Sequence, residues 1–387
     1  MSLPSPDIDR MKRDLASLVA INTENPPGRE REAAECIHSW LVAAGFDLTL
    51  SEYAPGRTNV IARLENGAGP CFAFNTHIDV VPAGNGWSQD PFTLTERDGK
   101  LYGRGACDAK GPLVAMLEAM RMLAANRESW RGTLMGIFVA DEEVASEGAK
   151  FYVREAPAKI DYAVIGEPTS NSTYSAHKGS LRPLVRVHGV TAHSGTPELG
   201  ENAIFRAAQL LGLVEQAHNQ QVRCRCHPLV GAASLTVTRI AGGHADNVLP
   251  DSCDLLLDRR LVPGEDQQQV EQELRDLLAL AEEKFGVKSD IVTFKPTTGG
   301  ATETPADEAI VQAGLAACRK HGQPDPGPFG FQGGCDLVHF RSLGTKGVVI
   351  GPGALAVAHK PDEFVPVSEF IAASKIYRDV ALAMLNP

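Results

Sequence analysis

The sequence predicts an α/β protein, with a mixed sheet flanked by helices and a small α+β domain inserted into the chain. Short apolar runs alternate with helical patterns between residues 7 and about 177, which is typical of a sheet covered on both faces. From about residue 180 the strand candidates alternate polar with apolar residues, as half-exposed antiparallel strands do. The first pattern returns after about residue 305, so the differing block is an insertion.

The elements before the insertion follow from apolar spacing and from the residues that end them. A helix is expected over 7–20, where Met11, Leu15 and Leu18 share one face, and another over 29–44, which Gly45 ends. The remaining elements are strands 58–64, 71–78, 132–143 and 161–168 and helices 111–128 and 147–155.

The inserted block has its own order of elements. Its strands are expected at 180–190, 231–243, 251–262 and 288–296, and its helices at 202–219 and 266–285. This strand–helix–strand–strand–helix–strand order is that of a ferredoxin-like sandwich. Helices 307–321 and 367–385 and strand 347–351 come after it. We therefore expect one domain from residues 1–177 and 295–387, and a second from residues 178–294.

The composition argues against several classes of protein. The 387 residues are 43% hydrophobic and 22% charged, as in an ordinary globular protein. The net charge of −11 argues against nucleic acid as a partner, and no apolar run approaches the length of a membrane span. The N-terminal segment lacks the apolar core of a signal peptide. The eight cysteines are scattered, and Cys224-Arg-Cys226 has no second pair, so we expect free thiols in a cytoplasmic protein.

Residue types that ligate metals follow the ends of the predicted strands. The strand-end residues are His77 and Asp79, then Asp141-Glu142-Glu143, then Glu167, and finally His359. Asp108 lies in the glycine-rich loop 103–111, which leads into a long helix. Ligands of open α/β sheets bind outside the carboxyl ends of the strands, so these side chains are expected around one cleft.

Each of these residues has a plainer interpretation when it is taken alone. His77 and Asp79 could share a surface hydrogen bond, Asp108 could cap the helix, and the glutamates could be solvated loop acids. Acidic side chains gathered at one point, however, repel each other unless a cation is present. Imidazole and carboxylate ligands suit Zn²⁺, or else Co²⁺ or Mn²⁺, and one shared carboxylate would give a site for two metal ions.

Ordered motifs along the chain resemble those of the M20 metallopeptidase family. They are THIDVVP, GRGACDAKG, ADEE, IGEPT, GVTAHSG, NVLPD, DRR and GPG followed by AH, and the resemblance runs from about residue 10 to the C-terminus. It implies a zinc-peptidase-like catalytic domain, with the insertion serving as the lid and dimerisation domain of a homodimer. It also implies a cis peptide bond between Asp108 and Ala109.

The resemblance assigns a metal ligand set to these positions. His77, Asp108 and Glu167 would hold one divalent ion. Asp108, Glu143 and His359 would hold the other, with Asp108 as the bridge.

The resemblance further implies three catalytic residues. Asp79 would orient His77, and Glu142 would be the general base. His193, from the small domain of a neighbouring subunit, would stabilise the oxyanion. A family member that had lost catalysis would be expected to lack Glu142, which is present, and the sequence has no G-x-S-x-G elbow of a serine hydrolase.

The candidate substrate-binding residues are assigned from shorter motif matches. Asn247 and Arg260 match family motifs and would bind a substrate carboxylate, with Arg259 as the adjacent alternative, since arginine suits bidentate recognition of carboxylates. Gly333 lies in QGGCD, which resembles the GGSD loop of the family, with Cys335 in the place of a serine or threonine.

The expected substrate is an N-acyl amino acid or a dipeptide. The expected activity is amide hydrolysis of the acetylornithine deacetylase type. The alternatives are a succinyl-diaminopimelate desuccinylase and an M20 dipeptidase or carboxypeptidase.

Overall fold

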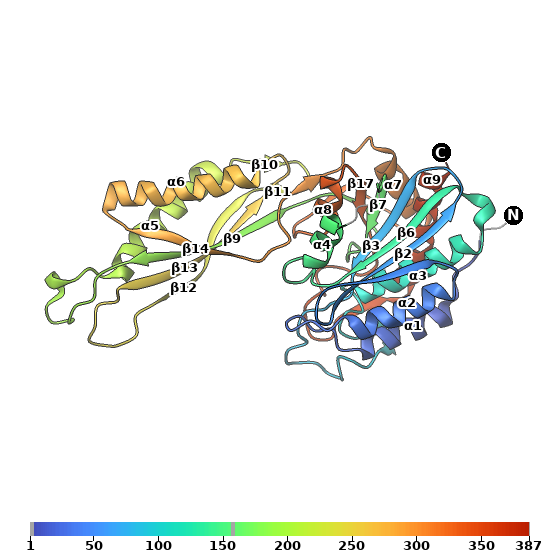
Figure 1. Ribbon diagram of the computed structural model, residues 1–387, viewed down its shortest axis with the longest axis horizontal. Helices are drawn as coiled ribbons and strands as arrows, with labels where there is room; N and C mark the ends of the chain where they lie inside the picture. Colours follow the sequence, from blue (N-terminus) through green and yellow to red (C-terminus); the bar gives the residue numbers. More distant parts are fainter. Residues whose placement is uncertain (1–3, 156–158, 387) are drawn as a thin grey trace. The chain divides into compact units, whose positions relative to one another are not determined.

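The chain forms two compact units in the computed structural model, which describes residues 4–155 and 159–386. The first unit combines the chain before residue 177 with residues 303–330 and the chain from Cys335 onward. The second unit comprises His177–Thr302 together with Phe331–Gly334. Each unit is described below by itself (Figure 1).

The first unit is built on a large mixed sheet in the order β1-β2-β6-β3-β7-β17-β8-β15, with β16 paired to β8. Its strands are β1 (Asp47–Ala54), β2 (Arg57–Asn66), β3 (Cys71–His77), β6 (Gly132–Val139), β7 (Tyr162–Ile165), β8 (Tyr174–His177), β15 (Thr302–Glu303), β16 (Phe329–Phe331) and β17 (Lys346–Val349). The four central strands β6, β3, β7 and β17 run parallel to each other, whereas β1, β2 and β8 pair antiparallel with their neighbours. This is the mixed sheet that the sequence predicts.

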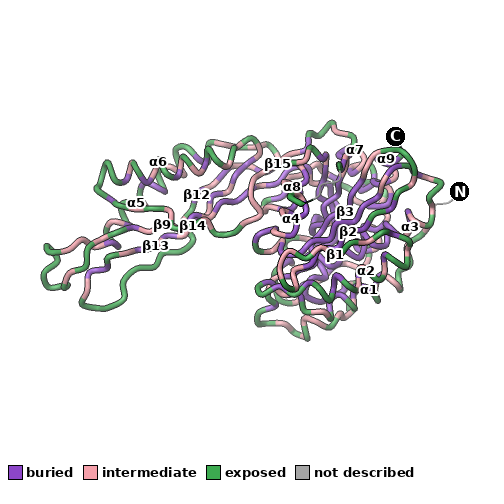
Figure 2. The backbone as a smooth tube through the Cα atoms, in the orientation of Figure 1, coloured by how far each residue is buried: buried purple, intermediate pink, exposed green. Residues whose placement is uncertain are grey.

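Helices cover both faces of this sheet. One face packs against α1 (Ile8–Ala20), α2 (Arg31–Val42), α3 (Lys110–Ala124), α7 (Ala309–Lys320) and α9 (Val367–Leu385), and the other against α4 (Glu147–Glu155) and α8 (Leu337–Ser342). Successive residues of β3 belong to the two cores in turn, because Phe72 and Phe74 join the first and Ala73 joins the second. The central strands are accordingly buried along most of their length (Figure 2).

A small three-stranded sheet joins two segments that are far apart in sequence. It has the order β18-β5-β4, with β4 (Thr95–Arg97), β5 (Lys100–Tyr102) and β18 (Phe364–Pro366). Phe364 lies opposite Tyr102 and Val365 opposite Leu101. The pairing therefore holds the chain just before Asp108 against the chain just after His359.

The second unit contains a four-stranded antiparallel sheet in the order β12-β13-β9-β14. Its elements are β9 (Gly179–His188), α5 (Ala203–Ala217), β10 (Cys226–His227), β11 (Gly231–Ala232), β12 (Ser234–Gly242), β13 (Ser252–Leu261), α6 (Gln267–Phe285) and β14 (Ser289–Lys295). The four sheet strands and the two helices follow each other in the predicted strand–helix–strand–strand–helix–strand order. None of the helices between residues 4 and 386, in the parts described, is long and apolar enough to cross a membrane.

Candidate metal centre

The carboxyl ends of the four parallel strands meet at one edge of the large sheet. His77 is the last residue of β3, Glu142 and Glu143 follow β6, Glu167 follows β7, and His359 follows β17. Strands β6, β3, β7 and β17 are direct neighbours in this order, so their ends lie side by side. The gathering of side chains that the sequence predicts is therefore a consequence of the strand order.

Asp108 lies between the two histidines. Its Oδ1 atom is 3.1 Å from Nε2 of His77, and its Oδ2 atom is 3.3 Å from Nε2 of His359. The same Nε2 atom of His359 is 3.1 Å from Oε2 of Glu143. The two oxygens of one carboxylate thus face two different imidazoles, which is the arrangement expected of a ligand shared by two ions.

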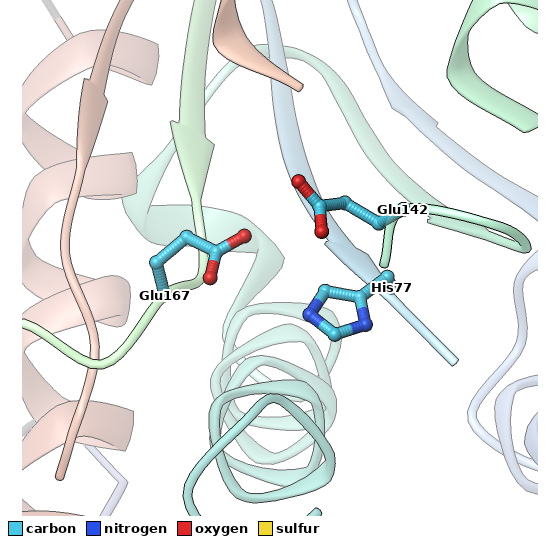
Figure 3. Close-up of side chains that lie close together, drawn as sticks. All are labelled: His77, Glu142 and Glu167. Atoms are coloured by element: carbon cyan, nitrogen blue, oxygen red, sulfur yellow. The ribbon is translucent and has the colours of Figure 1, made fainter. Parts of the chain in front are cut away.

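Two overlapping groups of side chains could each hold a metal ion. In each group, one ligand atom per residue lies within 4.8 Å of the others; the groups are His77 with Glu142 and Glu167, and His77 with Asp108 and Glu143. Figure 3 shows the imidazole of His77 and the carboxylates of Glu142 and Glu167 turned toward each other. The geometry therefore brings Glu142, predicted as the base, as close to His77 as a ligand would be.

The electrostatics of the cluster fit a cation. Burial, and then the charge of Glu167, raise the pKa of Glu142 well above its ordinary range, and burial followed by the charge of Asp108 does the same for Glu167. Asp336, whose charge also raises the pKa of Glu142, is a further acidic neighbour, and burial raises its own pKa to about 7. Among the described residues, the ion pairs of Asp108 and Glu143 are with histidines alone. Carboxylates crowded in this way, together with imidazole nitrogens, are a donor set suited to a divalent transition metal.

Asp79 supports the centre in two ways. Its backbone carbonyl accepts a hydrogen bond from Nδ1 of His77 at 2.9 Å, while its Oδ1 atom lies 3.5 Å from the same nitrogen. Its buried carboxylate accepts hydrogen bonds from the backbone N–H groups of Glu142 at 3.1 Å and Glu143 at 3.2 Å. Asp79 therefore lies beside His77, as expected, and it also holds the loop that carries the two glutamates.

Two contributors to the centre are missing from the sequence prediction. Asn25 donates from Nδ2 to Oδ2 of Asp79 and to Oδ1 of Asp141, both at 2.8 Å. Glu363 is buried, and its carboxylate accepts hydrogen bonds from the backbone of the loop that carries Asp108. The one available signal was their unusual setting in sequence, since Asn25 precedes two prolines and Glu363 lies four residues after His359.

The loop around Asp108 has the predicted backbone but no reactive thiol. The peptide bond between Asp108 and Ala109 is cis, as expected from the resemblance. The neighbouring Cys107 is buried, and burial raises the pKa of its thiol well above the ordinary value. A buried thiol that keeps its proton is not a nucleophile, so Cys107 does not support a cysteine hydrolase.

The remaining candidates, His193, Asn247, Arg260 and Gly333, all belong to the second unit. His193 and Asn247 are exposed and lie on neighbouring segments, where the N–H of Ser194 donates to the carbonyl of Asn247 at 2.9 Å. The metal-ligand candidates all belong to the first unit.

The two adjacent arginines of β13 have different surroundings. Arg259 is buried and ion-paired with Glu265. Arg260 is half-buried, and its Nε donates to Asp258 at 2.7 Å. Of the two, Arg260 is the one with a guanidinium accessible from solvent.

Comparisons with known proteins give one consistent result. The model of the family described as peptidase family M20/M25/M40 matches residues 73–383. Acetylornithine deacetylase from Vibrio vulnificus (strain CMCP6) is 32% identical over 361 residues, which cover 91% of this chain and 92% of that protein. Acetylornithine deacetylase from Myxococcus xanthus is 32% identical over 388 residues, covering 96% and 97%.

Solved structures share the fold. The M20 family metallo-carboxypeptidase Sso-CP2 from Sulfolobus solfataricus superposes with a TM-score of 0.82 at 18% identity, covering 97% of this chain and 99% of that one. A dinuclear metal binding peptidase of the M20 family from Bacillus subtilis gives a TM-score of 0.74 at 18% identity, covering 98% of each chain.

Proposed function

The chain belongs to peptidase family M20/M25/M40 and is a hydrolase, and from this premise we propose that it removes the acyl group from an N-acyl amino acid at a centre of two divalent metal ions. The observation that carries the proposal is the placement of Asp108, whose two oxygens face His77 and His359 separately. The proposed substrate is N-acetylornithine, because relatives at 32% identity over almost the whole chain carry the name acetylornithine deacetylase.

The proposed ligands are His77, Asp108 and Glu167 for one ion, and Asp108, Glu143 and His359 for the other. Zn²⁺ is the first candidate for both, since imidazole and carboxylate ligands suit it. When bound, such ions polarise an acyl oxygen and lower the pKa of a coordinated water molecule.

Glu142 is the proposed general base. It lies beside His77 and Glu167, and Asp79 fixes its backbone. From this position its carboxylate would accept a proton from the attacking water and deliver it to the nitrogen of the leaving amine.

His193 is the proposed donor to the oxyanion. Its Nδ1 atom accepts a hydrogen bond from the N–H of Gly195 at 3.0 Å, so a neutral ring carries its proton on Nε2. An exposed imidazole in this tautomer presents an N–H group outward, as an oxyanion donor must. We propose that Arg260 and Asn247 bind the carboxylate of the substrate and that Gly333 lines the same site.

The inserted block 178–294 is proposed as a lid and as the dimerisation domain of a homodimer. Apolar side chains are exposed on this unit, with Phe205 exposed by 73% and Leu199 by 72%. Strand β12 forms an edge of the four-stranded sheet, and most of its residues are exposed. Exposed apolar residues and an open strand edge favour association with a second copy.

The proposal is tested by metal removal and by comparing substrates. Exhaustive chelation should abolish hydrolysis, and Zn²⁺ or Co²⁺ should restore it. The rates of hydrolysis of N-acetylornithine, N-acetylmethionine, N-succinyl-diaminopimelate and a dipeptide should then be compared. Full activity after verified metal loss would refute the metal centre, whereas a preference for another substrate would refute the deacetylase assignment alone.

A further inference from the structure

A buried carboxylate outside the proposed ligand set joins the two loops that carry Asp108 and His359. The side chain of Glu363 is fully buried. Its Oε1 atom accepts hydrogen bonds from the backbone N–H of Cys107 at 2.9 Å and from that of Asp108 at 3.0 Å. A single oxygen atom of Glu363 therefore accepts both hydrogen bonds, at the point where the loop carries Asp108.

The other oxygen of Glu363 is held by a fixed cation. Oε2 is ion-paired with the guanidinium of Arg104, which is itself buried. The guanidinium also donates to the carbonyl of Ala83 at 3.2 Å and lies over the ring of Trp87, 5.1 Å from its centroid. Because Arg104 is anchored in these ways, the carboxylate of Glu363 has little freedom to turn away from the loop.

The backbone of Glu363 is attached to the same loop. Its carbonyl accepts a hydrogen bond from the N–H of Gly103 at 3.0 Å, which continues the pairing between β5 and β18. Glu363 is thus tied by its main chain to the start of the Asp108 loop and by its side chain to Asp108 itself. His359 lies four residues earlier in the same segment. These ties limit how far apart Asp108 and His359 can lie.

We infer that Glu363 is a positioning residue for the ion proposed between Asp108, Glu143 and His359, an inference that rests on the proposed two-metal function. The hydrogen bonds of the Glu363 carboxylate go to the backbone of Cys107 and Asp108 and to Arg104, so it acts on the backbone that aims Asp108 toward His359. Residues that orient metal ligands in this way typically change metal affinity about 10- to 100-fold when they are replaced.

Two substitutions separate the effect of where the Glu363 carboxylate lies from the effect of its negative charge. Glu363→Asp keeps the negative charge but withdraws it by one methylene from the two N–H groups. Glu363→Gln loses the charge but keeps an oxygen that can accept from both of them. A positioning role predicts that affinity for one ion falls about 10- to 100-fold in Glu363→Asp. It predicts a loss in Glu363→Gln as well, because with its oxygen on the two N–H groups the amide nitrogen of Gln faces the donors of Arg104. A purely electrostatic role predicts a loss in Glu363→Gln alone, since Glu363→Asp keeps the charge.

The measurement is a Co²⁺ titration of the metal-free full chain, followed by its visible absorbance and checked by metal analysis at equilibrium. His359→Ala identifies the binding step that belongs to the proposed second site. Glu118→Gln is the matched control, because Glu118 is also fully buried, pairs with Arg10 and Arg121, and accepts a backbone hydrogen bond from Asp7.

The outcomes are distinct. Loss of affinity in Glu363→Asp, at the step identified by His359→Ala, supports the inference if Glu118→Gln binds like wild type. Thermal unfolding of the metal-free variants shows whether they fold, and if only one Glu363 variant folds, its affinity relative to Glu118→Gln decides. Unchanged affinity in a folded Glu363 variant would overturn the inference while leaving the two-metal centre intact. A wild-type chain that binds no Co²⁺ would overturn both.

Discussion

Glu142 and Glu143 are neighbours in sequence, yet their carboxylates have different surroundings. Glu142 faces His77 and Glu167, whereas Glu143 contacts His359. We expect Glu142→Gln to keep its metal content and to lose about 10²- to 10⁴-fold in kcat, the usual contribution of a general base. Glu143→Gln should lose metal affinity as well as activity. Metal analysis beside steady-state kinetics checks both, and near-normal kcat in Glu142→Gln would show that the base is another residue.

Glu30 should make stability depend on pH. It is fully buried, its Oε2 lies 3.1 Å from Nε of Arg57, and burial followed by the charge of Asp79 raises its pKa from 4.5 to about 8. The unfolded chain loses this proton near pH 4.5 and the folded chain only near pH 8. Between these values the folded state therefore binds more protons, and stability falls as the pH rises.

Replacing Glu30 by Gln should remove this contribution. We expect the free energy of unfolding of the metal-free protein to fall less between pH 5 and pH 8 in Glu30→Gln than in wild type, by on the order of a few kcal/mol. Urea titrations at the two pH values measure it. Glu35→Gln, at an exposed position of helix α2, which begins directly after Glu30, is the control and should keep the wild-type dependence. If the free energy of unfolding changed equally with pH in all three proteins, the proton responsible would be bound by a residue other than Glu30.

At the scale of elements, sequence periodicity predicted the long helices well and the short polar elements poorly. Helix α6 spans Gln267–Phe285 where 266–285 was expected, because its apolar spacing is regular and Asp266 caps it. Helix α3 was expected to reach residue 128 but ends at Ala124, and a short 3₁₀ turn follows. Strand β1 was not predicted, since it lies at the sheet edge and none of its residues is fully buried.

The part of the metal centre that could be predicted from the sequence is the set of side chains at strand ends. His77 ends a buried strand, Glu143 and Glu167 follow two others, and alternation of strands and helices already implies that such ends meet. Asn25 and Glu363 act through hydrogen bonds between loops distant in sequence, which no local pattern encodes. Their roles can be recognised only when the pairing of these loops is known.

Helix α3 packs so closely on the Asp108 loop that its first turn requires glycine. A Cβ atom at Gly111 would overlap the carbonyl oxygen of Ala106. We expect Gly111→Ala to destabilise the protein by about 1–3 kcal/mol, as overpacking does, and to weaken metal binding by displacing the loop. Thermal unfolding and metal titration check this.

Gly212 provides the matched control for that substitution. It lies inside helix α5, and a Cβ placed there meets no atom within 4 Å beyond its chain neighbours and the backbone of its own helix. Gly212→Ala should raise stability by about 0.5–1 kcal/mol, because alanine has the higher helix propensity. Similar effects of the two substitutions would mean that the contact with Ala106 is not what constrains Gly111.

At the scale of the whole molecule, the proposed dimer makes a genetic prediction. If His193 acts in the site of the other subunit, His193→Ala and Glu142→Ala should each be nearly inactive alone. When the two are co-expressed, half of the dimers are mixed and each has one intact site, so activity should recover to about a quarter of wild type. Kinetics of the co-purified dimers measures it. Exchange of subunits without recovery would show that His193 does not act across the dimer.

The wide spacing of Asp108 and Glu363 along the chain also sets an order of events during synthesis. Glu363 follows Asp108 by 255 residues. At about 5–20 residues per second, a ribosome needs roughly 10–50 seconds to make that stretch. Through almost all of this interval the Asp108 loop lacks the carboxylate of Glu363, which anchors it, and the imidazole of His359. The nascent chain therefore cannot complete its proposed second ion site as it emerges, and capture of that ion becomes one of the last steps in the protein's maturation.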